Sequence, residues 1–195
     1  SISKVLDIGA NYGFFSLWLQ ATRPKQVIHA LMVEPSLTCI PSLERLTTEP
    51  FLDGRFQFLS KAIGKKNLVH IDFFERSHMA GSCFASSEGE TIQQVEVLKE
   101  EDIFQSLPPP YDLLKCDIEG SEWELIENYR NLLKSTKFLT LEWHSWHNGG
   151  GGFNQIKLNL KEIGFEITNF SRSKKATAKK GEVGTFLAKN LCFSF

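Results

Sequence analysis

The chain has 195 residues, of which 42% are hydrophobic, and a formal net charge of −1. This length suits one compact domain over residues 1–195, and the balanced charge argues against nucleic acid as a partner. No segment approaches the ~20 apolar residues of a membrane span, and four cysteines without CxxC spacing favour free thiols in a reducing, cytoplasmic compartment.

The predicted elements alternate between strands and helices along the chain. The first strand begins almost at the first residue, so an upstream segment could precede it in the natural protein. Phe15, Trp18 and Leu19 recur at helical spacing directly after that strand. In chain order, the predicted strands are Lys4–Ile8, Gln26–Val33, Arg55–Ile63, Leu68–Phe74, Val95–Leu98, Asp112–Asp117, Phe138–His144, Phe165–Phe170 and Gly184–Lys189.

Two more helices are predicted in the second half of the chain. Apolar residues recur at helical spacing between Ile126 and Leu133, and again between Ile156 and Ile163. Ser121 with Glu124 predicts a capping box at the start of the first of these helices. Gly164 predicts the end of the second, because glycine readily takes the left-handed conformation that stops a helix.

This alternation predicts an α/β fold with a mostly parallel, seven-stranded sheet and helices on both faces. The apolar strands VIHALMV and FLTLEW fit burial on both sides of such a sheet. The last two strands flank SRSKKATAKKGE, which is too polar for a crossover helix, so we expect an antiparallel hairpin with a basic, solvated tip. A parallel sheet that ends in one antiparallel hairpin strand is the layout of Rossmann-like class I methyltransferases.

The segment VLDIGANYGFF follows the first strand, where open α/β sheets bind their ligands. Its glycines permit backbone conformations that a Cβ would block. The dinucleotide pattern GxGxxG fails, because Asn11 and Phe14 stand where it requires glycine. The methyl-donor pattern acid-x-G-x-G-x-G is matched by Asp7, Gly9 and Gly13. Asn11 replaces the middle glycine, and Asn tolerates left-handed geometry better than most residues.

The charge of this turn also favours a methyl donor over a dinucleotide. A pyrophosphate prefers a helix N-terminus without a nearby carboxylate. S-adenosylmethionine instead carries an ammonium and a sulfonium, and Asp7 suits the ammonium, directly or through water. The alternative is that Asp7 only caps a tight turn.

A second acid, Glu34, ends the next predicted strand in LMVEPS. An acid at this place can accept both ribose hydroxyls of a nucleoside cofactor, although it could instead be an exposed surface carboxylate. By analogy with this fold, the end of the third strand forms an apolar floor for adenine. The predicted cofactor-binding residues are Asp7, Gly9, Ala10, Asn11, Gly13, Glu34, Pro35, Ala62, Ile63 and Asp117.

The most specific pattern lies in YDLLKCDIEGSEWELIEN, which reads K-x-D-x-E-G-x-E from Lys115 to Glu122. Together with DIGANYGFFS, VEPS and the strand end LEWH, it resembles the FkbM family of methyltransferases over nearly the whole chain. The resemblance implies a Rossmann-like fold and S-adenosylmethionine as the methyl donor. It also implies O-methylation of a hydroxyl on a sugar, lipid or polyketide-type small molecule.

Alternation along two neighbouring strands brings four ionisable side chains toward one cleft. Lys115 and Asp117 share a face of their strand, and Glu142 and His144 share a face of theirs. Because buried charges need partners, we expect Lys115 to pair with Glu142, while Asp117 and His144 face the cleft.

Methyl transfer requires an aligned acceptor oxygen and removal of its proton. The candidate catalytic residues are Asp117 and His144 as alternative bases, and Glu119, which orients the acceptor or contacts the donor. Glu122 is expected to stabilise a helix N-terminus. Each of these residues could instead be a solvated or paired loop residue.

A divalent metal is not favoured, because the sequence shows no tight ligand spacing such as HExxH. Oxygen and nitrogen ligands are nevertheless available from Asp117, Glu119, Glu142, His144 and His147. The loop SWHNGGGGF could be a flexible flap carrying Trp146 and His147, or an ordinary loop. Ser77–Glu90 is a candidate lining of the acceptor site.

Three functions therefore remain in order of preference. The first is an S-adenosylmethionine-dependent O-methyltransferase with a hydroxylated small-molecule acceptor. The second is a nucleoside- or S-adenosylmethionine-binding domain without catalysis. The third is an NAD-dependent oxidoreductase, against which the failed GxGxxG pattern argues.

Overall fold

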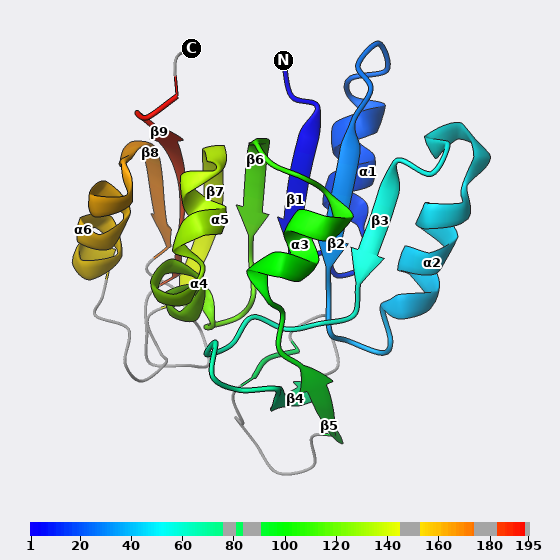
Figure 1. Ribbon diagram of the computed structural model, residues 1–195, viewed down its shortest axis with the longest axis horizontal. Helices are drawn as coiled ribbons and strands as arrows, with labels where there is room; N and C mark the ends of the chain where they lie inside the picture. The colour runs from blue at the N-terminus through cyan, green and yellow to red at the C-terminus, as the bar shows by residue number, and fades with distance from the viewer. Residues whose placement is uncertain (76–80, 84–90, 145–152, 174–182, 194–195) are drawn as a thin grey trace.

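The computed structural model describes residues 1–75, 81–83, 91–144, 153–173 and 183–193 of the chain. These residues form a seven-stranded sheet between helices, and a separate two-stranded sheet at one end of it (Figure 1). The seven strands are β1 (Lys4–Ile8), β2 (His29–Val33), β3 (Phe56–Leu59), β6 (Tyr111–Cys116), β7 (Thr136–His144), β8 (Phe165–Ser173) and β9 (Val183–Asn190).

The strand order is β3-β2-β1-β6-β7-β9-β8. The neighbouring strands β3, β2, β1, β6 and β7 are all parallel to one another, whereas β9 runs antiparallel to both β7 and β8. The predicted α/β fold, with a mostly parallel sheet and a C-terminal antiparallel hairpin strand, is confirmed. After β3 the chain returns to place β6 beside β1, and this reversal creates the crevice where such sheets bind ligands.

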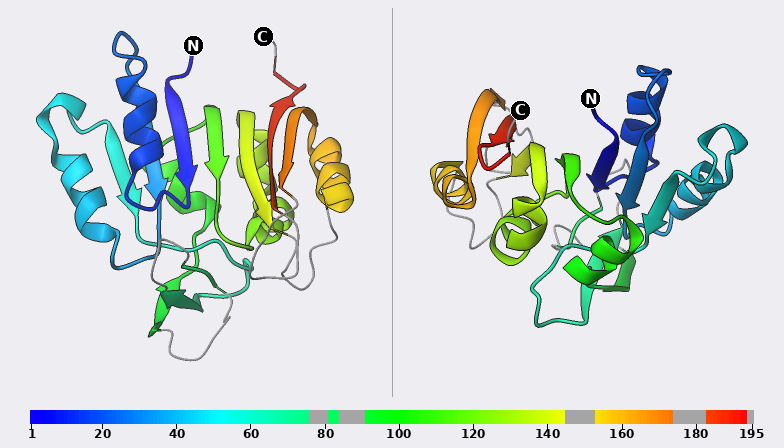
Figure 2. Two further views of the ribbon diagram at one scale, coloured as in Figure 1. Left: turned by 180° about the vertical axis from the view of Figure 1, so that it is seen from behind. Right: turned by 45° about the horizontal axis from the view of Figure 1, so that its top comes forward.

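Helices cover the two faces of the sheet unequally (Figure 2). On one side, α1 (Phe14–Ala21) and α2 (Ile40–Thr48) pack over the half of the sheet that contains β1–β3, and the short 3₁₀ helix Pro50–Leu52 follows α2. The other side carries α3 (Glu100–Ser106), α4 (Glu122–Asn128), α5 (Arg130–Lys134) and α6 (Phe153–Ile163). None of the helices in the described part of the chain is long and apolar enough to cross a membrane.

Consecutive residues of the inner strands pack into two different hydrophobic clusters, one on each face of the sheet, because side chains alternate along a strand. Val5 packs in the cluster beneath α1 and α2, whereas Leu6 packs in the cluster beneath α3–α6. Met32 and Val33 of β2 divide in the same way. Each side chain of this size contributes roughly 1.5–3 kcal/mol through burial, so both faces hold the central strands in place.

The predicted strand Leu68–Phe74 lies mostly in a small sheet of its own, and the predicted strand Val95–Leu98 overlaps the second strand of that sheet only at Val95 and Glu96. β4 (His70–Glu75) and β5 (Thr91–Glu96) form an antiparallel ladder apart from the main sheet. Most of their side chains are exposed or half-buried, which suits a hairpin on the surface and not the interior of a parallel sheet. The predicted strand 55–63 is also too long, because β3 ends at Leu59 and Ala62 forms an isolated bridge with Val97.

The predicted helix signals have mixed outcomes. The Ser121–Glu124 capping box is wrong: Ser121 makes no capping hydrogen bond through its side chain, and Glu124 instead accepts one from Asn128 at 2.8 Å. The stop at Gly164 is confirmed, because α6 ends at Ile163 and Gly164 has a φ of 111°.

The parallel strands all point toward the end of the molecule where β4 and β5 lie, and both chain termini lie at the opposite end (Figures 1 and 2). The loops that follow β1, β2, β3 and β6 therefore converge near the small sheet. The predicted basic hairpin tip, residues 174–180, lies outside the described residues.

Candidate functional site

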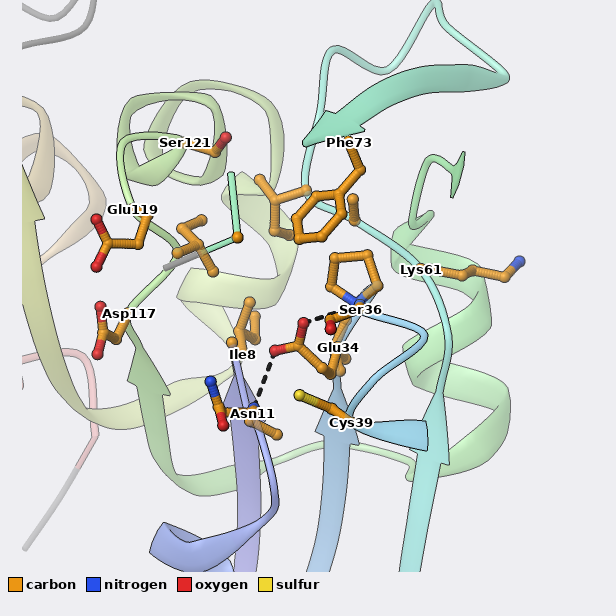
Figure 3. Close-up of a pocket in the computed structure, with 18 of the residues that line it drawn as sticks. Ile8, Asn11, Glu34, Ser36, Cys39, Lys61, Phe73, Asp117, Glu119 and Ser121 are labelled. Atoms are coloured by element: carbon orange, nitrogen blue, oxygen red, sulfur yellow. Dashed lines mark hydrogen bonds between the residues drawn. The ribbon is translucent and has the colours of Figure 1, made fainter. Parts of the chain in front are cut away.

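A cavity of about 540 Å³ opens at the carboxyl ends of the parallel strands. In Figure 3, Glu34 lies between Asp117 and Glu119 on one side and Lys61 on the other. The volume of the cavity falls within the range of roughly 300–1,000 Å³ that is typical of sites for small molecules and cofactors. Predicted site residues in its wall are Gly9, Ala10, Asn11, Glu34, Pro35, Ala62, Ile63, Asp117 and Glu119.

The turn after β1 has the backbone that its glycines predict. Gly9 and Gly13 have φ values of 73° and 79°, and Asn11 has a φ of 53°, so it does take the left-handed geometry. A Cβ on Gly9 would lie 1.8 Å from the carbonyl oxygen of Asp117, which leaves no room for any other residue. Gly13 does not line the cavity; a Cβ there would meet Leu46 at 2.4 Å.

The carboxylate of Glu34 joins this turn to the end of β2. Its Oε2 accepts a hydrogen bond from the Asn11 amide at 2.9 Å, and its Oε1 accepts one from the Ser36 amide at 3.0 Å (Figure 3). Glu34 is only 7% exposed, so it is not a surface carboxylate. Burial raises the pKa of Glu34, and the two amide donors oppose that rise.

Asp7 lies beneath the turn and does not line the cavity. It is fully buried; Ser16 donates a hydrogen bond to its Oδ2 at 2.8 Å, and the Nζ of Lys115 lies 3.4 Å from its Oδ1. Burial raises the pKa of Asp7 against the opposing effects of Lys115 and Ser16. The structure therefore gives Asp7 partners within the protein, and of these Lys115 itself lines the cavity.

The predicted ion pair between Lys115 and Glu142 is wrong. The Lys115 ammonium donates to the Gly9 carbonyl at 2.5 Å and faces Asp7. Register explains the difference, because Asp7 lies directly opposite Lys115 on β1, whereas Thr140 is the residue of β7 opposite Lys115. Glu142, two residues beyond Thr140, instead lies near its own strand neighbour His144, with 3.6 Å between carboxylate oxygen and Nε2.

Asp117, Glu119 and His144 do come together, as predicted, at the ends of β6 and β7. One ligand atom from each lies within 4.8 Å of the others, close enough to surround a cation. Asp117 and Glu119 line the cavity, but the His144 side chain is only 2% exposed and lies behind them. Glu119 has a φ of 52°, a conformation that is uncommon outside glycine.

Glu122 belongs to this cluster, although its pattern predicted only a helix terminus. Its Oε1 accepts a hydrogen bond from the Gly120 amide and bonds His144 Nδ1, each at 3.0 Å, and the side chain is 2% exposed. Burial lowers the pKa of His144, but the Glu122 hydrogen bond and the charges of Glu122, Glu119 and Asp117 outweigh it and leave the pKa above its ordinary value.

The small β4–β5 sheet closes one side of the cavity, which sequence reasoning missed. Phe73 of β4 lines it (Figure 3), and Glu75 accepts hydrogen bonds from the Leu37 amide at 2.7 Å and the Ser36 hydroxyl at 3.0 Å. Gln93 of β5 donates to the Pro35 carbonyl at 2.9 Å. No motif marks these residues, because their place depends on how the hairpin folds back over β2.

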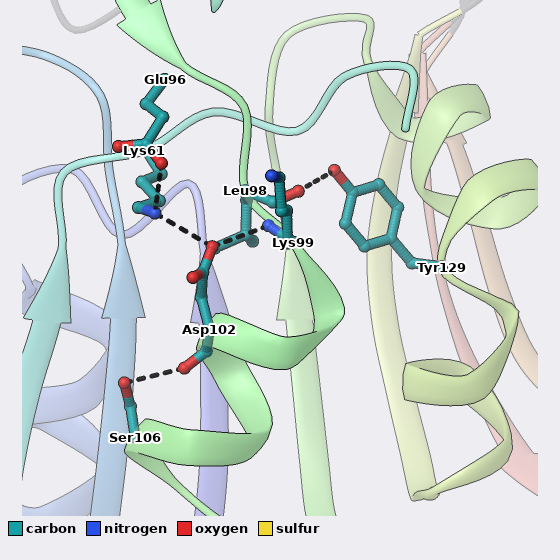
Figure 4. A network of polar contacts seen from close by, with 7 residues as sticks. All are labelled: Lys61, Glu96, Leu98, Lys99, Asp102, Ser106 and Tyr129. Carbon is teal, nitrogen blue, oxygen red and sulfur yellow. Dashed lines mark hydrogen bonds and ion pairs between the residues drawn. The ribbon is translucent and has the colours of Figure 1, made fainter. Parts of the chain in front are cut away.

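Ala62 and Ile63 are both buried and line the cavity, as predicted for an apolar floor. A polar network beside them fixes this segment (Figure 4). Lys61 donates to Glu96 at 2.8 Å and to Asp102 at 3.0 Å. Backbone hydrogen bonds from the Ala62 N–H to the Glu96 carbonyl and from the Leu98 N–H to the Ala62 carbonyl also hold the segment after β3 against the segment at the end of β5.

Some predicted parts of the site lie outside the described residues. They include Trp146 and His147 of the glycine-rich loop, and most of Ser77–Glu90. Of the latter segment, Gly81 and Cys83 are described and line the cavity.

Solved structures share this fold at low sequence identity. A methyltransferase FkbM from Methylobacillus flagellatus KT aligns with a TM-score of 0.56 and 16% identity, over 95% of this chain and 43% of that one. A magnesium protoporphyrin IX methyltransferase from Synechocystis PCC 6803, with bound S-adenosylmethionine, aligns at 0.56 and 13%, over 95% and 69%. These identities show the fold alone.

A third similar structure comes from Streptococcus pneumoniae, provisionally described as a tRNA (m1A22) methyltransferase and crystallised with S-adenosyl-L-methionine. It aligns with a TM-score of 0.54 and 13% identity, over 95% of this chain and 65% of that one. The chain thus spans less than two thirds of the Streptococcus and Methylobacillus proteins.

A search of curated proteins found no match to the chain. The sequence profile described as the methyltransferase FkbM domain, however, matches residues 7–167, from the acid of the glycine turn to β8. This span includes all the described residues that line the cavity. The chain therefore belongs to the FkbM family of methyltransferases.

Proposed function

We propose that the protein transfers the methyl group of S-adenosylmethionine to a hydroxyl oxygen of a small molecule such as a sugar, lipid or polyketide-type metabolite. The observation that carries this proposal is the buried Glu34 carboxylate in the cavity wall, hydrogen-bonded to the Asn11 amide of the glycine turn. The solved structures crystallised with S-adenosylmethionine in the same fold support this choice of cofactor.

The residues present fit this cofactor better than a dinucleotide. Glu34 retains lone pairs that can accept the ribose hydroxyls, and Ala62 and Ile63 offer an apolar surface to the adenine. Among the described lining residues, the lysines are Lys61 and Lys115, and carboxylates of the protein already engage both. The described part of the wall therefore offers no uncommitted lysine to a pyrophosphate.

When bound, S-adenosylmethionine supplies an electrophilic methyl group on its sulfonium. The protein has to orient the acceptor and accept its proton. We assign the proton to the Asp117 carboxylate, which lines the cavity, in preference to His144, whose side chain is 2% exposed. Glu119, beside it in the wall, orients the acceptor hydroxyl.

The free thiols of the described cysteines are consistent with a cytoplasmic location, which is part of the proposal. A neutral small molecule suits the balanced charge of the chain better than a nucleic acid does. Because one structural neighbour is provisionally a tRNA methyltransferase, tRNA belongs in the acceptor screen.

The proposal is tested with a methyl-labelled donor and a panel of hydroxylated metabolites, with tRNA as a separate arm. We expect label in a hydroxylated small molecule. Asp117→Asn should retain S-adenosylhomocysteine affinity but lower kcat by about 10²–10⁴-fold, because the amide cannot accept the proton. Asp53→Asn, at an exposed left-handed position that does not line the cavity, is the matched control and should leave kcat unchanged.

Transfer of label to tRNA alone would contradict the proposed acceptor class. An Asp117→Asn enzyme with normal turnover would remove Asp117 from proton transfer. The absence of label in every arm, with S-adenosylhomocysteine bound, would favour a binding domain without catalysis.

A further inference from the structure

Four carboxylates from three parts of the fold surround the buried imidazole of His144 at the end of β7. Its Nδ1 lies 3.0 Å from Oε1 of Glu122 on α4, and both side chains are 2% exposed. Its Nε2 lies 3.8 Å from Glu119 and 3.6 Å from Glu142. Asp117 brings a carboxylate oxygen within 4.8 Å of a ring nitrogen. The imidazole is thus placed to balance several negative charges at once.

Glu122 holds two parts of this arrangement with one buried oxygen. The same Oε1 that bonds His144 also accepts the Gly120 amide at 3.0 Å. Gly120 has a φ of 115° and follows Glu119, which has a φ of 52°. The turn that presents Glu119 to the cavity is therefore fastened to the carboxylate that orients the imidazole.

A buried carboxylate is costly unless a hydrogen-bonded counter-charge compensates it. Among the described residues, His144 forms an ion-pair contact with Glu122, and a protonated ring can donate from both nitrogens. Burial lowers the pKa of His144, but the carboxylates of Glu122, Glu119 and Asp117 outweigh burial and raise it overall. Geometry and charge thus agree that the fold favours the protonated form of the ring.

We propose that His144 is a positioning residue: a buried imidazolium, held by Glu122, that keeps the Glu119 carboxylate oriented at the cavity wall. The inference rests on the proposed function, in which Glu119 orients the acceptor. It gives His144 the role of a fixed cation and leaves proton removal to Asp117.

This role has a defined pH dependence. A raised pKa means that the imidazolium is fully present below the pKa of an unfolded histidine and is lost as pH rises through the higher folded value. Methyl transfer should therefore decline on the alkaline side of the His144 titration. A histidine that acted as the base would give the opposite trend, with activity rising as the ring loses its proton.

The first test follows the His144 ring by NMR titration of the full chain, assigned by the signal that disappears in His144→Gln. The wild-type ring should titrate above the ordinary histidine value. Glu122→Gln should lower that pKa by about one unit or more, a tenfold change in proton affinity. Glu124→Gln, on the same helix and bonded to Asn128, should leave it unchanged.

Loss of a buried carboxylate can unfold a protein, so Glu119→Gln provides a second variant. Its side chain is 30% exposed, and its removal should also lower the His144 pKa while the fold is retained. A wild-type ring that titrates at or below the ordinary histidine value would overturn the proposal. So would a pKa that neither glutamate variant lowers.

The second test uses kinetics with the acceptor that the screen identifies. Glu122→Gln and His144→Gln should each lower kcat about tenfold or more, with KM and S-adenosylhomocysteine affinity unchanged. The double variant should be no worse than either single one, because both act through the same ring. Glu122→Asp, which keeps the charge, should restore part of kcat and of the alkaline decline.

Other outcomes are distinguishable from failure of the proposed function. The NMR titration needs no cofactor. A raised His144 pKa in a protein that does not bind S-adenosylhomocysteine would therefore contradict the proposed methyltransferase function but still support an imidazolium held by Glu122. Activity that is lost with EDTA and restored by Mg²⁺ or Mn²⁺, with a shifted His144 resonance, would make the ring a metal ligand. That result would overturn its role as a cation.

Discussion

Gly9→Ala is expected to abolish S-adenosylhomocysteine binding and to lower the free energy of unfolding by about 3 kcal/mol or more. The added Cβ would lie 1.8 Å from the Asp117 carbonyl oxygen, which is backbone and cannot rotate away. Relief requires the turn after β1 to separate from the end of β6, and both segments form the cavity wall. Urea unfolding and calorimetric titration measure the two effects.

Gly54→Ala is a matched control for backbone strain. Gly54 also has a positive φ, 67°, but a Cβ there would meet nothing within 4 Å. It should therefore cost only about 1 kcal/mol, the usual penalty for the left-handed conformation, and leave binding intact. Equal destabilisation by the two substitutions would show that close approach to Asp117 is not what requires glycine at residue 9.

Glu34→Gln is expected to weaken S-adenosylhomocysteine binding by about 100-fold. Each carboxylate oxygen of Glu34 accepts a hydrogen bond from one backbone N–H. In glutamine, one of these oxygens becomes an NH2 group, which would face the N–H of either Asn11 or Ser36 and could not accept from it. The variant also loses a charged acceptor for the ribose hydroxyls, and charged hydrogen bonds contribute roughly 1.5–3 kcal/mol each. Calorimetry of folded protein measures the loss.

The control for this prediction is Glu44→Gln, an exposed residue of α2 whose affinity for S-adenosylhomocysteine should equal that of the wild type. The raised pKa of Glu34 adds a pH test. Affinity should begin to fall, as pH decreases, at a higher pH than the protonation of an ordinary glutamate would produce. Unchanged affinity in Glu34→Gln would remove this carboxylate from the cofactor site.

The fold and the placement of the glycine turn and Glu34 at the cavity could be predicted because their signals are local. Apolar periodicity marks the strands of the main sheet. The glycine turn has a backbone that few residues allow, and Asn11 is among those that do. Glu34 follows a strand whose position in the sheet is fixed by its neighbours, so its place at the cavity follows from topology.

The partners of buried charges could not be predicted in the same way. Strand alternation places Lys115 on a face, but sheet order and register decide which acid lies opposite, and β1 brings Asp7 there. The sequence places Glu122 at a helix terminus, where α4 does begin, but it does not reveal the bond to His144, which joins residues 22 positions apart. Such pairs depend on tertiary packing that no local pattern records.

The small sheet shows a further reason. The strand-like composition around residues 70–75 predicts a strand, which the structure confirms as β4, but composition does not say which sheet a strand joins. All but one of its side chains are exposed or half-buried, as suits a strand outside the main sheet, and Glu75 binds the segment that follows β2. The apolar residue that it contributes to the cavity, Phe73, could be assigned only with that packing known.

The central claim is that the cavity holds S-adenosylmethionine and not a dinucleotide. Calorimetric titration of the wild-type chain with S-adenosylhomocysteine, and separately with NAD, tests it most directly. We predict saturable binding of S-adenosylhomocysteine with one site per chain, and no heat of binding with NAD. Binding of NAD without binding of S-adenosylhomocysteine would contradict the account.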